Sequence, residues 1–394
     1  MIQAVVWWVF LALAPLVYWL LPARLRAGAL GVGSITLLAS SLGTDLIVMG
    51  VIAGLTYVGA GQDTARPWSR FLPFAALFSL ILLYFIWSKY LPGIARALAG
   101  EGTFLDTAAP IGVSYFSFKL MHYAIERRRG SLPVHGVQDF ACWLFLAPIF
   151  TAGPIERFEH FQREAETRQF ETRFLTEGLI RIAQGLVKKF VVALIVLEAL
   201  RNVTGGGLEN LLDGPAEPVA VWSGLLLSLL LVYLDFSAYS DIAIGSSRLF
   251  GYRIMENFDF PFAATTLQDF WQRWHMSLAN WCRSYIYMSM IGLTRNPYYA
   301  VVASFFVMGL WHSASLHWIA WGSWHGVGLA WLLFWGRYAK KRQLMLNRTM
   351  PGRILARTLT IGYVALGGAL TAMHGRAPFG DSLRLIGRSV GLEL

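Results

Sequence analysis

The chain has 394 residues, of which 56% are hydrophobic, 14% are aromatic and only 14% are charged. A globular domain is usually about a quarter charged. So little charge excludes a soluble protein of this length, a disordered chain, a coiled coil and a secreted disulfide scaffold. We therefore expect an all-α polytopic membrane protein that forms a single domain over residues 1–394.

The positive charges of the chain lie between its apolar runs. The formal net charge is +10, and basic residues cluster at 127–129, 188–189 and 337–348. Cytoplasmic loops of membrane proteins carry such an excess of Lys and Arg, and no nucleic-acid-binding motif accompanies the clusters. We expect a lipid bilayer, and no nucleic acid, as a partner. Cys142 and Cys282 form no CxxC pair, so we expect no thiolate metal or redox site.

Apolar runs of about 20 residues, the length needed to cross a bilayer, follow one another along the chain. The clear candidates are 4–22, 70–88, 218–234, 298–312, 316–336 and 355–373; the runs 27–41 and 45–60 are rich in small residues, and 137–152 and 178–200 are interrupted by polar ones. We expect about nine to eleven membrane helices, some of them short or re-entrant. The first run has no basic leader and no small-residue cleavage site, which predicts a retained first helix.

Polar residues separate the runs in three places. Residues 154–173 carry alternating charges and predict an amphipathic helix or loop on the cytoplasmic face. Residues 202–217 predict a loop because they contain three consecutive glycines, and residues 337–354 predict a basic cytoplasmic loop.

Three histidines, His275, His312 and His325, lie in hydrophobic, Trp-rich surroundings. Ionisable side chains inside a membrane bundle are costly, so each is a candidate functional residue. A neutral imidazole can act as a general base, whereas a single buried histidine can also be purely structural. His312 and His317 are five apart, which does not place two imidazoles on one helix face, and no carboxylate cluster accompanies them. We expect no metal site, and no Gly-x-Ser-x-Gly elbow of a serine hydrolase is present.

Several segments in this order resemble motifs of the membrane-bound O-acyltransferase family. They are Pro110 to Phe118, Ala152 to Phe158, Asp235 to Gly245, Asp269 to Leu278, the Gly-Leu-Trp-His run ending at His312, and Trp324-His325-Gly326. The resemblance covers about residues 105–330, more than half of the chain. Each motif alone is weak, but together, in the family's order, they are specific.

The resemblance implies acyl transfer from a thioester to a hydroxyl group. His312 matches the essential histidine of the family, and His275 matches a second site position where other members carry Asn or His. We expect His312 to remove the proton of the acceptor hydroxyl, and His275 to donate to the oxyanion or to hold the pocket in shape. The helices would form a bundle around a tunnel, with His312 near its waist.

Seven further residues are candidates for substrate binding. Asp269 and Arg273 are four apart and would share a helix face. They form either a structural ion pair or a contact with a phosphate of the donor, and Arg157 has the same two interpretations. His325 is expected to line the tunnel. The full set is Trp311, Trp274, Arg273, Asp269, His325, Asp241 and Arg157.

The subgroup is left open by the motifs. Tyr239 to Gly245 resembles the bacterial proteins that supply acetyl groups to alginate and other exopolysaccharides. The segment after Arg283-Ser-Tyr-Ile-Tyr287 lacks their Pro-Leu-Gly-Gly run, and Ser313 stands where glycine is common. The leading donor is acetyl-coenzyme A, with a cell-surface or periplasmic polysaccharide as the final acceptor. The alternative is a D-alanyl thioester on the phosphopantetheine of an acyl carrier protein, for transfer to an envelope polymer.

The resemblance also implies a setting. We expect a multi-pass protein of the bacterial cytoplasmic (inner) membrane, with no bound cofactor and with a periplasmic or membrane-anchored acyltransferase as partner. Two rivals of another class remain: a transporter or channel whose intramembrane His and Asp relay protons, and a scaffold without catalytic activity.

Overall fold

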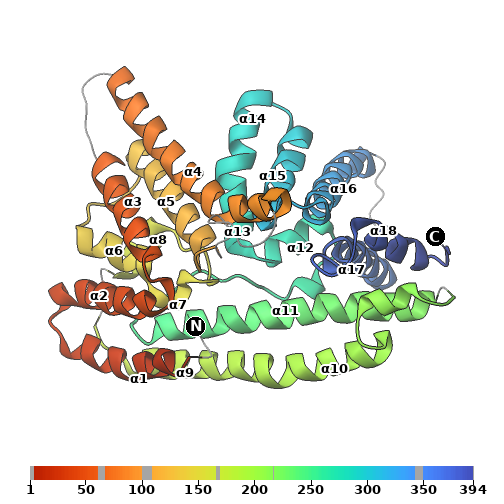
Figure 1. Ribbon diagram of the computed structural model, residues 1–394, viewed down its shortest axis with the longest axis horizontal. Coiled ribbons are helices and arrows are strands. Elements are labelled where there is room, and N and C mark those ends of the chain that lie inside the picture. Colours follow the sequence, from red (N-terminus) through yellow and green to blue (C-terminus); the bar gives the residue numbers. More distant parts are fainter. Residues whose placement is uncertain are drawn as a thin grey trace. The chain divides into compact units, whose positions relative to one another are not determined.

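The computed structural model describes residues 4–60, 67–99, 109–165, 169–215, 217–341 and 349–393, and the regular elements in these ranges are helices (Figure 1). This confirms the predicted all-α class. Residues 166–168 of the predicted amphipathic stretch, residue 216 of the predicted loop, and residues 342–348 with the predicted basic Arg342 and Arg348 lie outside the described residues. The resemblance begins at about 105, and residues 105–108 also lie outside them.

The chain folds into two compact units. The first comprises Met1–Gln184 and Tyr239–Met255, and the second Gly185–Ala238 and Glu256–Leu394. The first unit contains α1 (Val5–Leu20), α2 (Ala23–Leu42), α3 (Asp45–Ala60), α4 (Pro67–Ala99), α5 (Val113–Arg129), α6 (Val137–Phe145), α7 (Ala147–Phe150), α8 (Phe158–Ala165), most of α9 (Thr172–Val187) and the end of α11 (Pro218–Arg248). That the whole chain forms one domain stays a prediction.

The second unit contains the remaining elements. They are the π-helical turn η1 (Lys188–Val192), α10 (Ala193–Thr204), η2 (Leu208–Leu212), most of α11, η3 (Pro261–Ala263), α12 (Leu267–Arg273), α13 (Met276–Cys282), the π-helical turn η4 (Arg283–Tyr287), α14 (Met288–Thr294), α15 (Pro297–His312), α16 (Leu316–Lys341), α17 (Met350–Ala372) and α18 (Phe379–Arg388). Two of the boundaries between the units fall within α9 and α11, and the third lies between Met255 and Glu256.

The apolar runs of the sequence become helices. Among the described residues, four helices are long and apolar enough to cross a membrane, namely Ala23–Leu42, Pro73–Ile94, Pro218–Arg248 and Met350–Ala372. Val5–Leu20 and Asp45–Ala60 are shorter apolar helices. The predicted runs 298–312 and 316–336 form α15 and α16, and their passage through a membrane stays a prediction, as does the total of nine to eleven spans.

The interrupted runs are helical with local breaks. The run 137–152 is split at Leu146 into α6 and the short α7. Pro148 explains the split, because proline has no N–H to continue the hydrogen-bond ladder of α6. The run 178–200 is one path of α9, η1 and α10, with a π-helical turn where Lys188 and Lys189 lie.

Glycines bring α15 and α16 into close contact, and Figure 1 shows the two helices side by side. A Cβ atom on Gly309 would overlap the carbonyl oxygen of Trp318, and one on Gly322 would overlap that of Phe305. A Cβ on Gly326 would lie 3.0 Å from the Cα of Val302. Small residues at helix interfaces allow such approach in membrane proteins. The close pairing places the end of α15, with His312, against the first turns of α16.

Candidate active site

A cavity of about 280 Å³ in the second unit brings four of the predicted residues together. His275, His312 and His325 all line it, although they come from three different elements, and Trp274 lines it as well. The rest of the wall is mostly apolar and aromatic, including Phe236, Trp271 and further residues of α11, α15, α16 and α17. Apolar walls with a few convergent polar groups are typical of small-molecule sites.

His312 is the last residue of α15, and its ring lies among three indoles. It stacks on Trp318, with 4.1 Å between ring centroids and an interplanar angle of 12°. Trp311 lies edge-on at 4.5 Å and Trp321 edge-on at 5.5 Å. The next residue, Ser313, has φ −164° and ψ 149°. Any residue adopts this extended backbone, so Ser313 fits here without strain.

His275 lies between α12 and α13 with an unusual backbone. Its φ is 44° and its ψ is 51°, in the left-handed region that only few non-glycine residues occupy. The imidazole is buried, and its edge meets Phe236 at 4.6 Å between ring centroids. Among the described residues, its Nε2 atom has no hydrogen-bond partner. Strain at a residue that lines a cavity is a common mark of functional sites.

The segment 257–259 holds this strained residue from both sides. The N–H of Met276 donates to the carbonyl oxygen of Asn257 at 2.9 Å, and the Ser277 hydroxyl donates to the Asn257 amide oxygen at 2.6 Å. On the other side, the N–H of Asp259 donates to the carbonyl oxygen of Arg273 at 3.0 Å. These bonds fix the direction in which the His275 side chain leaves the backbone.

His325 is fully buried in the first turns of α16. Its ring meets Trp271 edge-on at 5.1 Å and Trp321 at 5.0 Å. Within the described part of the chain, its Nδ1 atom lacks a hydrogen-bond partner. A Cβ atom on Gly367 would lie 2.9 Å from the other nitrogen, so this glycine lets α17 pack against the imidazole.

Three other predicted residues of this unit do not line the cavity. Trp311 lies beside His275 and His312, with 6.2 Å between the ring centroids of Trp311 and His275. Asp269 and Arg273 form the ion pair that their spacing allowed, with 2.7 Å between Nε and Oδ1, and Arg273 also reaches Asp259 at 3.4 Å. The hydrogen bond with Asp269 raises the pKa of Arg273 further, so it stays charged. Thr266 caps α12 by accepting from the N–H of Asp269 at 3.0 Å.

A second cavity of about 330 Å³ adjoins the first. Trp271 and Met308 belong to the walls of both cavities. The second one is more polar, and the π-helical turn η4 contributes Arg283 and Tyr287 to it. The sequence reasoning did not single out Met308 or Arg283 as site residues. The signal in the sequence was an arginine close to two tyrosines, in the run from Arg283 to Tyr287.

The remaining two predicted residues belong to the first unit. Asp241 is buried and accepts from Arg181 at 2.6 Å. Arg157 is half-buried and lies 4.0 Å from Glu159. The assignment of both to substrate binding stays a prediction.

The described residues contain no group of three or more His, Cys, Asp or Glu that are placed to hold a metal ion. The two cysteines, Cys142 and Cys282, are both buried free thiols. Neither lies with the three histidines in the first cavity.

Comparison with known proteins adds to this geometry. Residues 103–361 match the membrane-bound O-acyltransferase family. A probable alginate O-acetylase of Pseudomonas aeruginosa is 37% identical over 216 residues, which is 54% of this chain and 40% of that protein. A teichoic acid D-alanyltransferase of Streptococcus thermophilus is 32% identical over 54% of each chain. A peptidoglycan O-acetyltransferase of Helicobacter pylori is 28% identical over 58% of this chain and 42% of that protein. The chain thus spans about half the length of these curated relatives.

Proposed function

The chain belongs to the membrane-bound O-acyltransferase family, and from this premise we propose that it transfers an acyl group from a thioester donor to a hydroxyl group. The observation that carries the proposal is the meeting of His275 and His312 in one aromatic cavity, although 37 residues separate them in the sequence. The family relation supplies the reaction class, and the cavity supplies a place for it.

His312 acts as the general base in the proposed reaction. Its imidazole removes the proton of the acceptor hydroxyl while that oxygen attacks the thioester carbonyl carbon. The tetrahedral intermediate then collapses, the carbon–sulfur bond breaks, and the leaving thiolate takes the proton from the imidazolium. Its stacking on Trp318 and the edge contact with Trp311 support this role, because they hold the ring in one orientation.

His275 stabilises the oxyanion. Its Nε2 atom has no partner among the described residues, and the side chain lines the same cavity as His312. In the tautomer with its hydrogen on Nε2, it donates to the negative oxygen of the intermediate. One such donor in a dry site contributes about 10²–10³ in rate.

The second cavity is the route of the thioester donor. Its wall includes Arg283, Gln268 and Asn280, which suit the amide groups and the phosphate of a phosphopantetheine arm. The shared wall of Trp271 and Met308 would have to shift for the acyl end to reach the histidines. The acceptor enters the histidine cavity from elsewhere, so that the two substrates meet at His312.

Acetyl-coenzyme A is the proposed donor, and an envelope polysaccharide is the proposed final acceptor. The 37% identity to a probable alginate O-acetylase supports this choice. A D-alanyl thioester on an acyl carrier protein is the second candidate, favoured by the teichoic acid relative. With either donor we propose a multi-pass location in the cytoplasmic membrane, and a periplasmic or membrane-anchored acyltransferase as the partner that completes the transfer.

The test offers both donors to the purified protein in lipid nanodiscs. Radiolabelled acetyl-coenzyme A and a D-alanyl-loaded carrier protein are supplied separately, and thioester loss is measured for the wild type, His312→Ala and His374→Ala. His374 is exposed and does not line either cavity, so its variant controls for the loss of an imidazole.

We expect turnover of acetyl-coenzyme A that disappears in His312→Ala and persists in His374→Ala. Turnover of the carrier thioester alone would keep the mechanism and replace the donor. Turnover that survives in His312→Ala would contradict the role of His312. Solute flux without any acyl product would favour the transporter interpretation.

A further inference from the structure

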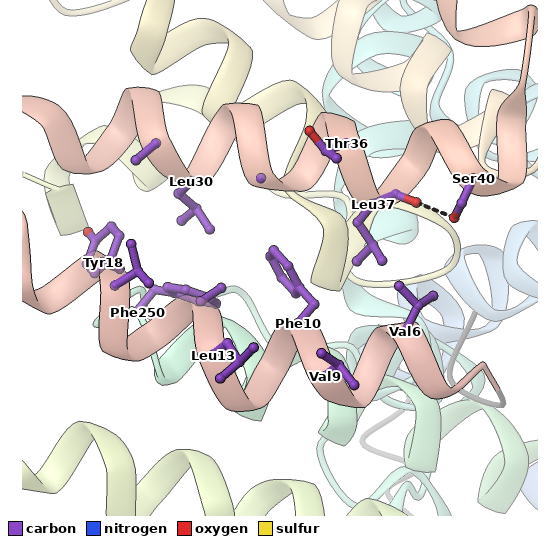
Figure 2. Close-up of a pocket in the computed structure, with 14 residues that line it drawn as sticks. Val6, Val9, Phe10, Leu13, Tyr18, Leu30, Thr36, Leu37, Ser40 and Phe250 are labelled. Carbon is purple, nitrogen blue, oxygen red and sulfur yellow. Dashed lines mark hydrogen bonds between the residues drawn. The ribbon is translucent and has the colours of Figure 1, made fainter.

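A long apolar groove lies between α1 and α2 in the first unit (Figure 2). Its volume is about 440 Å³, and side chains such as Val6, Leu13, Leu30, Leu37 and Phe250 point into it from both helices and from the segment after α11. The Ser40 hydroxyl at its rim donates to the carbonyl oxygen of Leu37 at 2.7 Å and is thus satisfied. The groove offers almost only hydrocarbon to whatever fills it.

The apolar stripe that α1 contributes to the groove is exposed. Leu13 and Val17 are 57% and 55% exposed, and Val6 is 49% exposed. An exposed contiguous apolar surface marks a contact with another apolar body. Gly33 of α2 keeps the groove open, because a Cβ atom there would lie 3.4 Å from Phe10 and larger side chains would project further into the space.

The length of the groove fits one leaflet of a bilayer. Its lining on α1 runs from Val6 to Tyr18. The twelve residue steps between them rise about 18 Å, and half of a hydrocarbon core of about 30 Å is about 15 Å. A lipid acyl chain therefore matches the groove from end to end.

One end of the groove carries aromatic rings and a positive charge. Tyr18 lines this end, and its ring meets Phe250 edge-on at 5.4 Å (Figure 2). The Arg26 guanidinium lies 4.9 Å from the ring centroid of Trp19 and 5.8 Å from that of Tyr18. It also donates to the carbonyl oxygens of Leu21 at 3.0 Å and Trp19 at 3.4 Å, which fixes it beside the end of α1.

This arrangement is that of a membrane–water interface. Trp and Tyr gather at the headgroup level of a bilayer, and a guanidinium binds phosphate oxygens with its planar fork of N–H groups. We propose that the groove binds one anionic phospholipid, with an acyl chain between α1 and α2 and its headgroup phosphate at Arg26. The site is separate from the proposed acyl transfer and involves none of its residues.

The test is native mass spectrometry of the full-length protein released from detergent. The protein is titrated with phosphatidylglycerol and, separately, with phosphatidylcholine of the same acyl chains, and the bound lipid is counted. We expect the wild type to retain one phosphatidylglycerol molecule. Gly33→Leu and Thr36→Leu each fill the groove from α2 and should remove this lipid.

Arg26→Gln tests the headgroup contact. We expect about tenfold weaker binding of phosphatidylglycerol, and loss of the preference over phosphatidylcholine, because a charge-assisted hydrogen bond is removed. Arg24→Gln is the matched control. Arg24 is exposed on the same helix, and two residues turn an α-helix by about 200°, so its side chain faces away from the Arg26 side. This variant should bind like the wild type.

Four results would overturn the proposal. They are no retained lipid in the wild type, equal binding of the two lipids, binding that persists when both filling variants remain folded, and a dimer of this chain that dissociates when the groove is filled. Thermal unfolding of each variant establishes that it is folded. Acyl transfer assayed in the same variants separates this site from the proposed function, since failure of one leaves the other intact.

Discussion

Two groups of buried polar side chains, one in each unit, differ in whether their hydrogen bonds are satisfied. In the first unit, Lys119 and Glu156 are each 1% exposed. The Lys119 ammonium donates to the carbonyl oxygen of Trp143 at 2.8 Å, and Glu156 accepts from the N–H of Met255 at 2.9 Å and bonds to His160. In the second unit, His275 and His325 are 5% and 1% exposed. Each has a ring nitrogen without a hydrogen-bond partner among the described residues.

The difference shows that burial alone does not mark a functional residue. A buried polar group without a partner costs about 1–3 kcal/mol, so the fold tolerates it where something else is gained. Groups that satisfy one another in the first unit contribute to stability and specify the packing. Groups that face a cavity in the second unit are available to a substrate. Substitutions in the two regions should therefore fail in different ways.

The largest expected effect is on stability, in the first unit. Glu156→Ala removes the acceptor for Met255 and His160 and the negative charge that favours the buried Lys119 ammonium. Breaking a buried charge pair in this way costs about 3–5 kcal/mol. We expect a much lower unfolding temperature in detergent. Glu171→Ala is the control, because that carboxylate is 46% exposed and pairs with Arg173 at the surface, where the cost is below about 1 kcal/mol.

The second expected effect is on rate, in the histidine cavity. His275→Ala should lower the rate of acyl transfer about 10²–10³-fold while the unfolding temperature changes little. His275→Asn should lower the rate less than His275→Ala does. Asparagine tolerates the left-handed backbone seen at this position, and its amide N–H can donate a hydrogen bond to the oxyanion. Steady-state kinetics together with thermal unfolding separates the two effects. A rate loss that only follows lost stability would place His275 with the structural residues of the first unit.

The third effect concerns the helix pair that supports His312. Gly309→Ala forces a methyl group against the Trp318 backbone, and overpacking of this kind costs about 1–3 kcal/mol. The stacking partner of His312 then shifts, so the rate should also fall. Gly292→Ala in α14 is the control. Apart from its own helix backbone and chain neighbours, no heavy atom of the described residues lies within 4 Å of its added Cβ, and alanine favours a helix by up to about 1 kcal/mol. Equal stability of the two variants would contradict the close pairing of α15 and α16.

Hydropathy alone predicted most helices, because the need to bury apolar runs in a bilayer is a local property of the sequence. The runs 4–22, 45–60 and 218–234 appear as α1, α3 and the first part of α11. The pairing of α15 with α16 was not predictable in this way, since it depends on which glycines face one another. Gly309 and Gly322 meet across the pair, but neither has a pattern that names its partner.

The sequence predicted which residues belong to the candidate site better than it predicted how they are arranged. His275 and His312 were selected by their resemblance to family motifs and by their cost in a membrane. Neither the positive φ of His275 nor its restraint by Asn257 can be read from residue types. The second cavity depends on a π-helical turn at Arg283, and the periodicity of the sequence carries no clear signal for such a turn.

The smallest expected effect is a pH dependence of stability that comes from the Glu156–His160 pair in the first unit. The hydrogen bond from Glu156 raises the pKa of His160 above its ordinary value of 6.5, against a smaller opposing effect of burial. The charge of Glu164 acts in the same direction and that of Arg163 in the opposite one.

A raised pKa in the folded state means that protonation of His160 stabilises the fold. This contribution is complete below pH 6.5 and is lost as the pH rises through the raised value. The unfolding temperature should therefore fall over that range, and His160→Gln should reduce the fall. An unchanged pH profile in this variant would show that the Met255 N–H holds Glu156 without help from the imidazolium, and the carboxylate would then be satisfied by fewer groups than its geometry suggests.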